Sequence, residues 1–168
     1  MKTKRLTLMA LLLSIALIVF VIELRIPPIV PIPGIKLGLA NSIILFSLFT
    51  MKKSETMMII VLRVIIGNVY AGSIMSMMYS LSGALVCFVM MCLVSKFVNQ
   101  EQVWICSICG AIGHNIGQIL IAVAVTQTVS IFMYLPVLML SAIITGLITG
   151  LIAQALIGRM TNVLNVSR

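Results

Sequence analysis

The sequence has 168 residues, of which 62% are hydrophobic and only 8% are charged, and its formal net charge is +8. A soluble domain carries about a quarter charged residues, so this composition excludes an ordinary soluble domain and indicates an integral membrane protein. The basic excess is then a signal of membrane topology and not of nucleic-acid binding.

Apolar stretches follow one another along the chain, and each is about as long as a membrane-spanning helix. We predict six transmembrane helices, over about residues 6–24, 35–50, 56–70, 74–94, 103–126 and 135–157. The short links leave no room for a soluble domain, so we expect a single all-α transmembrane domain over residues 1–168. The first stretch is interpreted as a retained helix and not as a signal peptide. The third and fourth share residues 57–95, so we expect one of them to be tilted, short or partly re-entrant.

The uneven distribution of basic residues predicts how these helices are oriented. With the N-terminus inside, the outer segments hold only Arg25 and Lys36. The inner segments hold eight basic residues, which are Lys2, Lys4, Arg5, Lys52, Lys53, Lys96, Arg159 and Arg168. By the positive-inside rule, six spans with both termini in the cytoplasm are expected.

The segment PPIVPIPGIKLGLAN, residues 27–41, contains four of the five prolines of the chain. Proline cannot continue a helix and favours an extended residue before it, so we expect a stiff extracellular loop that enters the second helix at a fixed angle. Lys36 falls in the first turn of that helix, where the helix dipole disfavours a cation. It either has an anionic partner, such as Glu23, a lipid headgroup or a ligand, or it snorkels to the membrane surface.

Polar residues within the predicted spans are costly in a membrane and are therefore candidates for function. Most of them fall in the outer half of the bilayer, as expected for a pocket open to the exterior. Arg63 lies nearer the inner surface, to which it could simply snorkel. The predicted substrate contacts are Lys36, Asn41, His114, Asn115 and Gln118, with Glu23, Arg63 and Asn68 behind them. The alternative is that these groups only form hydrogen bonds between helices.

Small residues four apart mark faces on which helices approach closely. Gly113 and Gly117 form one such pair, and Gly146 and Gly150 form another. Ala10 and Ser14 give a similar pattern in the first span. We expect these pairs to serve internal packing, with the docking of a partner subunit as the alternative.

The four cysteines would have to converge to hold zinc or an iron–sulfur cluster. Cys106 and Cys109 form a CxxC pair, but Cys87 and Cys92 would point about 140° apart on a helix. We therefore expect buried thiols that act as small apolar residues and no metal site. The chain also has no aspartate, no DDxxD motif and no P-loop. Catalysis, ATP hydrolysis by this chain alone and a bound cofactor are not expected.

The segments PIPGIKLGLANSIILFSLF, LRVIIG, GAIGHNIGQI and YLPVLMLSAIITGLITGLIA resemble a bacterial membrane family described as heptaprenyl diphosphate synthase component I or Gx transporter. The resemblance covers nearly the whole chain. That family is similar to the S components of energy-coupling factor (ECF) transporters. These are six-helix proteins of the cell membrane that bind a vitamin or similar small molecule from outside, and they work with a transmembrane T component and two ATPases.

The resemblance implies a substrate-binding subunit for uptake, occluded under the proline loop and the link between the third and fourth spans. It also implies that Ala10 and Ser14 dock the T component, although the usual pattern is Ala-x-x-x-Ala and Ser14 departs from it. Two other roles stay open. One is an accessory subunit in prenyl or quinone metabolism, and the other is a partner in flavin-based extracellular electron transfer, with flavin or a metal near Cys106 and Cys109.

Overall fold

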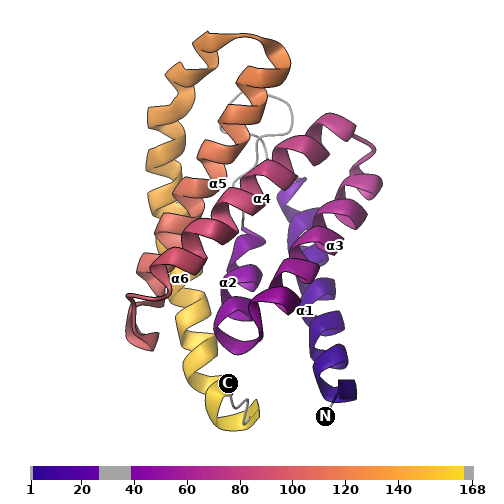
Figure 1. Cartoon of the computed structure of the whole chain (residues 1–168), viewed down its shortest axis with the longest axis vertical. Helices are drawn as coiled ribbons and strands as arrows, with labels where there is room; N and C mark the ends of the chain where they lie inside the picture. Colours follow the sequence, from indigo (N-terminus) through magenta and orange to yellow (C-terminus); the bar gives the residue numbers. More distant parts are fainter. Residues whose placement is uncertain (1, 27–38, 165–168) are drawn as a thin grey trace.

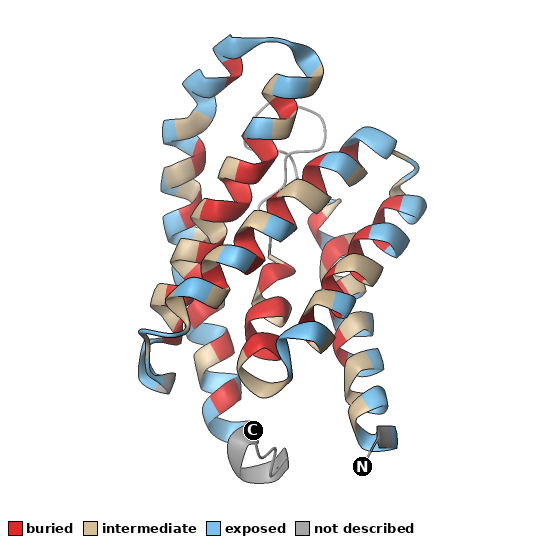
Figure 2. Ribbon diagram, in the orientation of Figure 1, coloured by how far each residue is buried: buried red, intermediate tan, exposed pale blue. Residues whose placement is uncertain are grey.

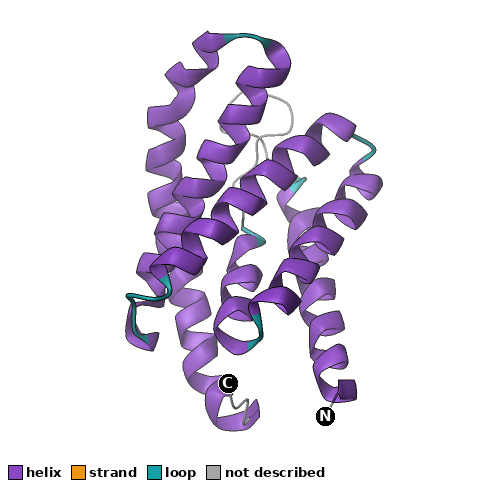
Figure 3. Cartoon of the chain, viewed as in Figure 1, coloured by secondary structure: helices purple, strands orange, loops and turns teal. Residues whose placement is uncertain are grey.

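The computed structural model describes residues 2–26 and 39–164, and this part of the chain contains helices, turns and no strand (Figure 3). Six α-helices are present: α1 (Lys2–Glu23), α2 (Asn41–Thr50), α3 (Lys53–Ala71), α4 (Ile74–Val94), α5 (Val103–Thr126) and α6 (Leu135–Leu164). Two 3₁₀-helices, η1 (Gln100–Gln102) and η2 (Val129–Tyr134), precede α5 and α6. The predicted bounds of α4 and α5 are confirmed, whereas α6 continues to Leu164 and the link before it is helical.

Five of the helices are long and apolar enough to cross a membrane, and α2 is not one of them. It has 10 residues, which is about 15 Å of helix or half of the hydrocarbon core. The predicted start of this span at residue 35 and the proline segment, residues 27–38, lie outside the described residues. The all-α membrane fold is therefore established, and the count of six complete spans stays a prediction.

The helix α2 lies at the centre of the bundle (Figure 1). It contacts each of the other five α-helices. Its residues Ile44 and Leu45 are completely buried, and most of its surface is covered (Figure 2). A helix that is apolar on all sides is stable where neighbours surround it, which explains why this short element is the buried one.

Glycines set the spacing of α4, α5 and α6. A Cβ atom on Gly150 would lie 2.6 Å from the Cα of Trp104, and one on Gly146 would lie 2.8 Å from the Cα of Ile108. A Cβ on Gly117 would lie 2.7 Å from the carbonyl oxygen of Ser82. Both predicted glycine pairs therefore serve contacts within the chain, since α5 packs along α4 and along α6. The prediction of internal packing is confirmed for them.

The turn between α3 and α4 is built by its own residues. Gly72 ends α3 with φ 65°, a left-handed conformation that glycine adopts without strain. Ser73 then begins α4, and its Oγ accepts a hydrogen bond of 3.2 Å from the backbone N–H of Ser76. Because Gly72 caps the end of α3 and Ser73 caps the start of α4, the turn needs no further residues.

The start of α1 and the end of α6 lie at the same end of the molecule (Figure 1). The turn between α2 and α3 is at that end too, and the turn between α3 and α4 is at the other. An ion pair of 3.6 Å between Arg5 and Glu55 joins α1 to α3 near the termini. The end with the termini is the one that the distribution of basic residues predicts to be cytoplasmic.

The bundle exposes apolar side chains and buries polar ones. Leu6, Ile18 and Leu140 are each at least 60% exposed, while twelve polar or charged residues are buried. A protein in water shows the reverse. The outer faces of the helices therefore suit the hydrocarbon of a bilayer.

Candidate functional site: a polar interior

Seven of the eight predicted contact residues are buried inside the bundle. They are Glu23, Asn41, Arg63, Asn68, His114, Asn115 and Gln118, each at most 5% exposed. The eighth, Lys36, lies outside the described residues. The buried set also contains hydroxyl groups of α4, notably Ser76 and Ser80, which the sequence did not single out.

Arg63 connects three helices in this interior. It is 3% exposed, and its Nη1 donates a hydrogen bond of 3.3 Å to Oδ1 of Asn41, the first residue of α2. The negative charge of Glu23, at the end of α1, also acts on it. The expectation that Arg63 snorkels to the inner surface is wrong. Because α3 begins at Lys53, Arg63 lies about 15 Å along the helix and faces inward.

His114 and Gln118 form the second part of the polar interior. They share a face of α5, as their spacing predicts, because a Cβ atom on Gly83 of α4 would lie 2.9 Å from both side chains. Gln118 is completely buried, and neither its Nε2 nor its Oε1 has a hydrogen-bond partner. Leaving such a group unpaired costs about 1–3 kcal/mol for each donor or acceptor.

Helix α4 links the two parts. Gly83, which makes room for His114 and Gln118, is one turn before Cys87. Cys87 in turn lies near Arg63. The polar interior, defined here as Glu23, Asn41, Arg63, His114 and Gln118, therefore extends from α1 across the bundle to α5. Sequence reasoning missed Gly83, whose only signal is a glycine in an otherwise regular apolar helix.

The other two predicted contact residues are bound elsewhere. Nδ2 of Asn115 donates a 2.7 Å hydrogen bond to the carbonyl oxygen of Leu138 and thereby joins α5 to α6. Nδ2 of Asn68 donates to the carbonyl oxygen of Val64 at 2.8 Å, within α3. Both amide nitrogens are therefore engaged by backbone carbonyl oxygens.

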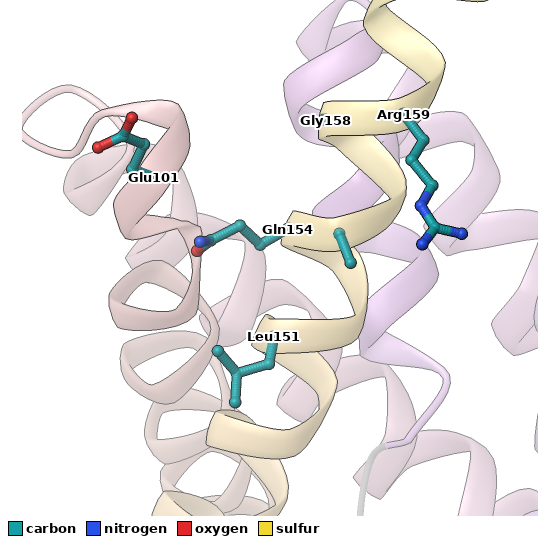
Figure 4. A pocket seen from close by; sticks show the side chains of 6 residues that line it. Glu101, Leu151, Gln154, Gly158 and Arg159 are labelled. Carbon is teal, nitrogen blue, oxygen red and sulfur yellow. The ribbon is translucent and has the colours of Figure 1, made fainter.

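Two cavities lie near the ends of the bundle. One, of about 480 Å³, is at the end with the termini, between η1 and α6, and Figure 4 shows Gln154 directed from α6 toward the segment with Glu101. Arg159, also in its lining, extends to the other side of α6. The second, of about 200 Å³, is at the turn between α3 and α4 and is lined in part by Asn68. Neither is lined by Arg63 or Gln118.

The predicted docking residues Ala10 and Ser14 are both exposed on α1. The Oγ of Ser14 donates a 2.9 Å hydrogen bond to the carbonyl oxygen of Ala10. The hydroxyl group is therefore satisfied within the helix, and this face carries only small side chains at these two positions. Unlike the glycine pairs of α5 and α6, this pair is therefore not used in packing within the chain.

The thiols show no metal-binding geometry in the described residues. Within residues 2–26 and 39–164, no group of three or more His, Cys, Asp or Glu residues could hold a metal ion. Cys87 and Cys106 are completely buried between α4 and α5. Cys106 donates to the carbonyl oxygen of Met91 at 3.3 Å, which is a contact between helices.

A comparison with known proteins connects this arrangement to one family. The chain matches the family model of heptaprenyl diphosphate synthase component I over residues 12–156. The same comparison found no curated protein and no solved structure that matches the chain. The matched region contains α2 to α5 complete and every member of the polar interior. The chain belongs to the heptaprenyl diphosphate synthase component I family.

Proposed function

We propose that this protein is the membrane-embedded, substrate-binding subunit of an uptake system in the bacterial cell membrane, and that it works like an ECF S component. The observation that carries the proposal is the polar interior, above all Gln118, a completely buried amide with both hydrogen-bonding atoms unpaired. Intramembrane polar groups of this kind are typical of substrate pathways. A ligand that pairs with them offsets a desolvation cost that the protein already carries.

The polar interior defines what the ligand must offer. Gln118 provides an amide NH2 group as donor and a carbonyl oxygen as acceptor, and Arg63 provides a cation whose Nε is unpaired. Lys36, Asn68 and Asn115 complete the proposed contacts, the first near the predicted outer surface. The ligand is accordingly a small polar molecule that enters from outside.

To release the ligand inside the cell, the loaded subunit would have to reorient in the membrane. The energy for this step would come from partner subunits, because the sequence contains no nucleotide-binding motif. The family description itself names a component, which supports a subunit that depends on a partner. In this proposal, Ala10 and Ser14 dock a transmembrane T component, which in turn binds two ATPases. Their exposure on the outer face of α1 leaves them accessible for such a contact.

The family description favours a second candidate function, an accessory membrane subunit for prenyl diphosphate synthesis. The chain has no aspartate with which to hold magnesium and diphosphate, so the chemistry would belong to the partner. In that case the membrane subunit would position the enzyme or its lipid product at the bilayer.

Co-purification distinguishes the two functions. The chain would be purified in mild detergent from its own membranes and its partners identified by mass. We expect a T component and ATPases, lost in Ala10→Trp and kept in Leu140→Trp, a change at an exposed position of α6. Recovery of a soluble prenyltransferase in place of the ATPases would establish the accessory function and refute the transporter.

A further inference from the structure

The cavity of about 200 Å³ at the turn between α3 and α4 is separate from the polar interior. Its lining consists of Asn68, Val69, Gly72, Ser73, Ile74 and Met77. The turn at which it lies is in the half of the molecule opposite the termini (Figure 1). Its volume corresponds to roughly seven water molecules in the liquid, so it can take a small group but not a whole lipid.

Asn68, in the lining of this cavity, carries an unused acceptor. The side chain is 3% exposed, and the hydrogen bond from its Nδ2 to the carbonyl oxygen of Val64 fixes its orientation. Its Oδ1 is buried and has no partner. On α4, the Oγ of Ser76 is also buried without a partner, three residues after Ser73 of the lining. A donor brought into the cavity would satisfy an acceptor that is otherwise costly to bury.

The surroundings of the cavity are those of a bilayer and not of water. Two of its wall residues, Val69 and Ile74, are 73% and 75% exposed, and the neighbouring Tyr70 is 67% exposed. No charged residue occurs between positions 64 and 95. The 19 residues of α3 span about 28 Å, close to the thickness of the hydrocarbon core, so the turn lies near its edge.

We propose that this cavity binds a membrane-dissolved molecule that carries a hydroxyl group on an apolar body. The hydroxyl donates to Oδ1 of Asn68, and the apolar part lies against Val69, Ile74 and Met77. Met77, in the same lining, has a flexible, unbranched side chain that can adapt to the bound molecule. The site goes beyond the proposed function, because it opens to the lipid and shares only Asn68 with the proposed substrate contacts.

Photolabelling tests the proposal with two matched probes. The first is 3-azioctanol, an eight-carbon alcohol with a photoreactive diazirine, and the second is the diazirine alkane of the same length without the hydroxyl. The full chain would be labelled in lipid nanodiscs and the modified residues mapped by mass spectrometry. We expect saturable labelling of residues 68–77 by the alcohol, about fivefold above the alkane, the ratio that one net hydrogen bond provides.

Three variants separate recognition from simple exposure to lipid. Asn68→Leu should reduce labelling by the alcohol to the level of the alkane, and Asn99→Leu, at an exposed asparagine, should leave it unchanged. Ile74→Trp, at a wall position that is 75% exposed, should block both probes. Equal labelling by the two probes, or labelling that survives Asn68→Leu and Ile74→Trp, would overturn the proposal. Gln118, the residue that carries the proposed function, is unchanged in all three variants, so failure of this proposal leaves that one standing.

Discussion

Arg63 is the residue on which the polar interior most depends. Moving a charge from water into a protein within a membrane costs several kcal/mol unless partners compensate for it. Here Asn41 accepts a hydrogen bond from it and Glu23 supplies the opposite charge. The three residues belong to three different helices, so one guanidinium holds α1, α2 and α3 together.

Replacing Arg63 by glutamine should therefore destabilise the protein strongly. We expect a loss of about 3–5 kcal/mol, because Glu23 would lose the positive charge of Arg63 and Oδ1 of Asn41 would lose its donor. The double variant Arg63→Gln with Glu23→Gln should recover most of that loss. Thermal unfolding of the purified protein in detergent measures both effects, with Arg25→Gln, at an exposed arginine, as the control. Equal midpoints for Arg63→Gln and Arg25→Gln would contradict the account.

Which residues are buried could be predicted from the sequence, but which way they point could not. Polar side chains stand out in apolar helices, and the seven described candidates are all buried. His114 and Asn115 are neighbours in the chain, yet about 100° separates them on the helix, and Asn115 binds α6. That direction depends on where the neighbouring helices lie, which single-sequence spacing does not contain.

At the scale of helices, local signals account for the bounds that were predicted correctly. Gly72 and Ser73 separate α3 from α4, and the polar stretch before Val103 separates α4 from α5. The end of α6 was not predicted, because glycine commonly ends a helix but α6 runs through Gly158 and continues to Leu164. The central position of α2 also depends on the tertiary arrangement, since its length alone only suggests an incomplete span.

Glycine-to-alanine changes on α6 should have opposite signs at two positions. Gly150→Ala places a methyl group 2.6 Å from the Cα of Trp104, so α5 and α6 must separate, and we expect a loss of roughly 1–3 kcal/mol. Gly158→Ala meets no atom within 4 Å and should be neutral or stabilising by about 0.5–1 kcal/mol, through higher helix propensity. Unfolding midpoints measure both, and a stabilising Gly150→Ala would show that this contact is not close-packed.

The whole molecule has the polarity of a membrane bundle whose ends differ in charge. Lys52, Lys53 and Arg159 lie toward the end that carries the termini, while the turns after α3 and α5 carry no charge. An outer end with only Arg25 and Lys36, together with an inner end rich in basic residues, is the arrangement that the positive-inside rule favours. The predicted orientation in the cell therefore rests on charges distributed over the whole molecule and not on those of any one helix.

Cysteine labelling on intact cells tests this orientation. In a background without the four native cysteines, Thr128→Cys at the turn after α5 should react with a membrane-impermeant maleimide. Thr3→Cys and Ser54→Cys, both exposed at the other end, should react only after lysis. Reaction of Ser54→Cys in intact cells would show that the orientation is the opposite one, and it would refute a site that opens to the outside.

The measurement that tests the central claim most directly is native mass spectrometry of the protein released gently from its own membranes, comparing ligand retention between variants. The wild type should carry one small polar molecule, and Gln118→Leu should lose it while remaining folded, because leucine removes two unpaired groups at similar volume. Gln127→Leu, at an exposed glutamine after α5, should retain it. If the wild type carries no small molecule, or if Gln118→Leu retains it as well as the wild type does, the polar interior is not the binding site.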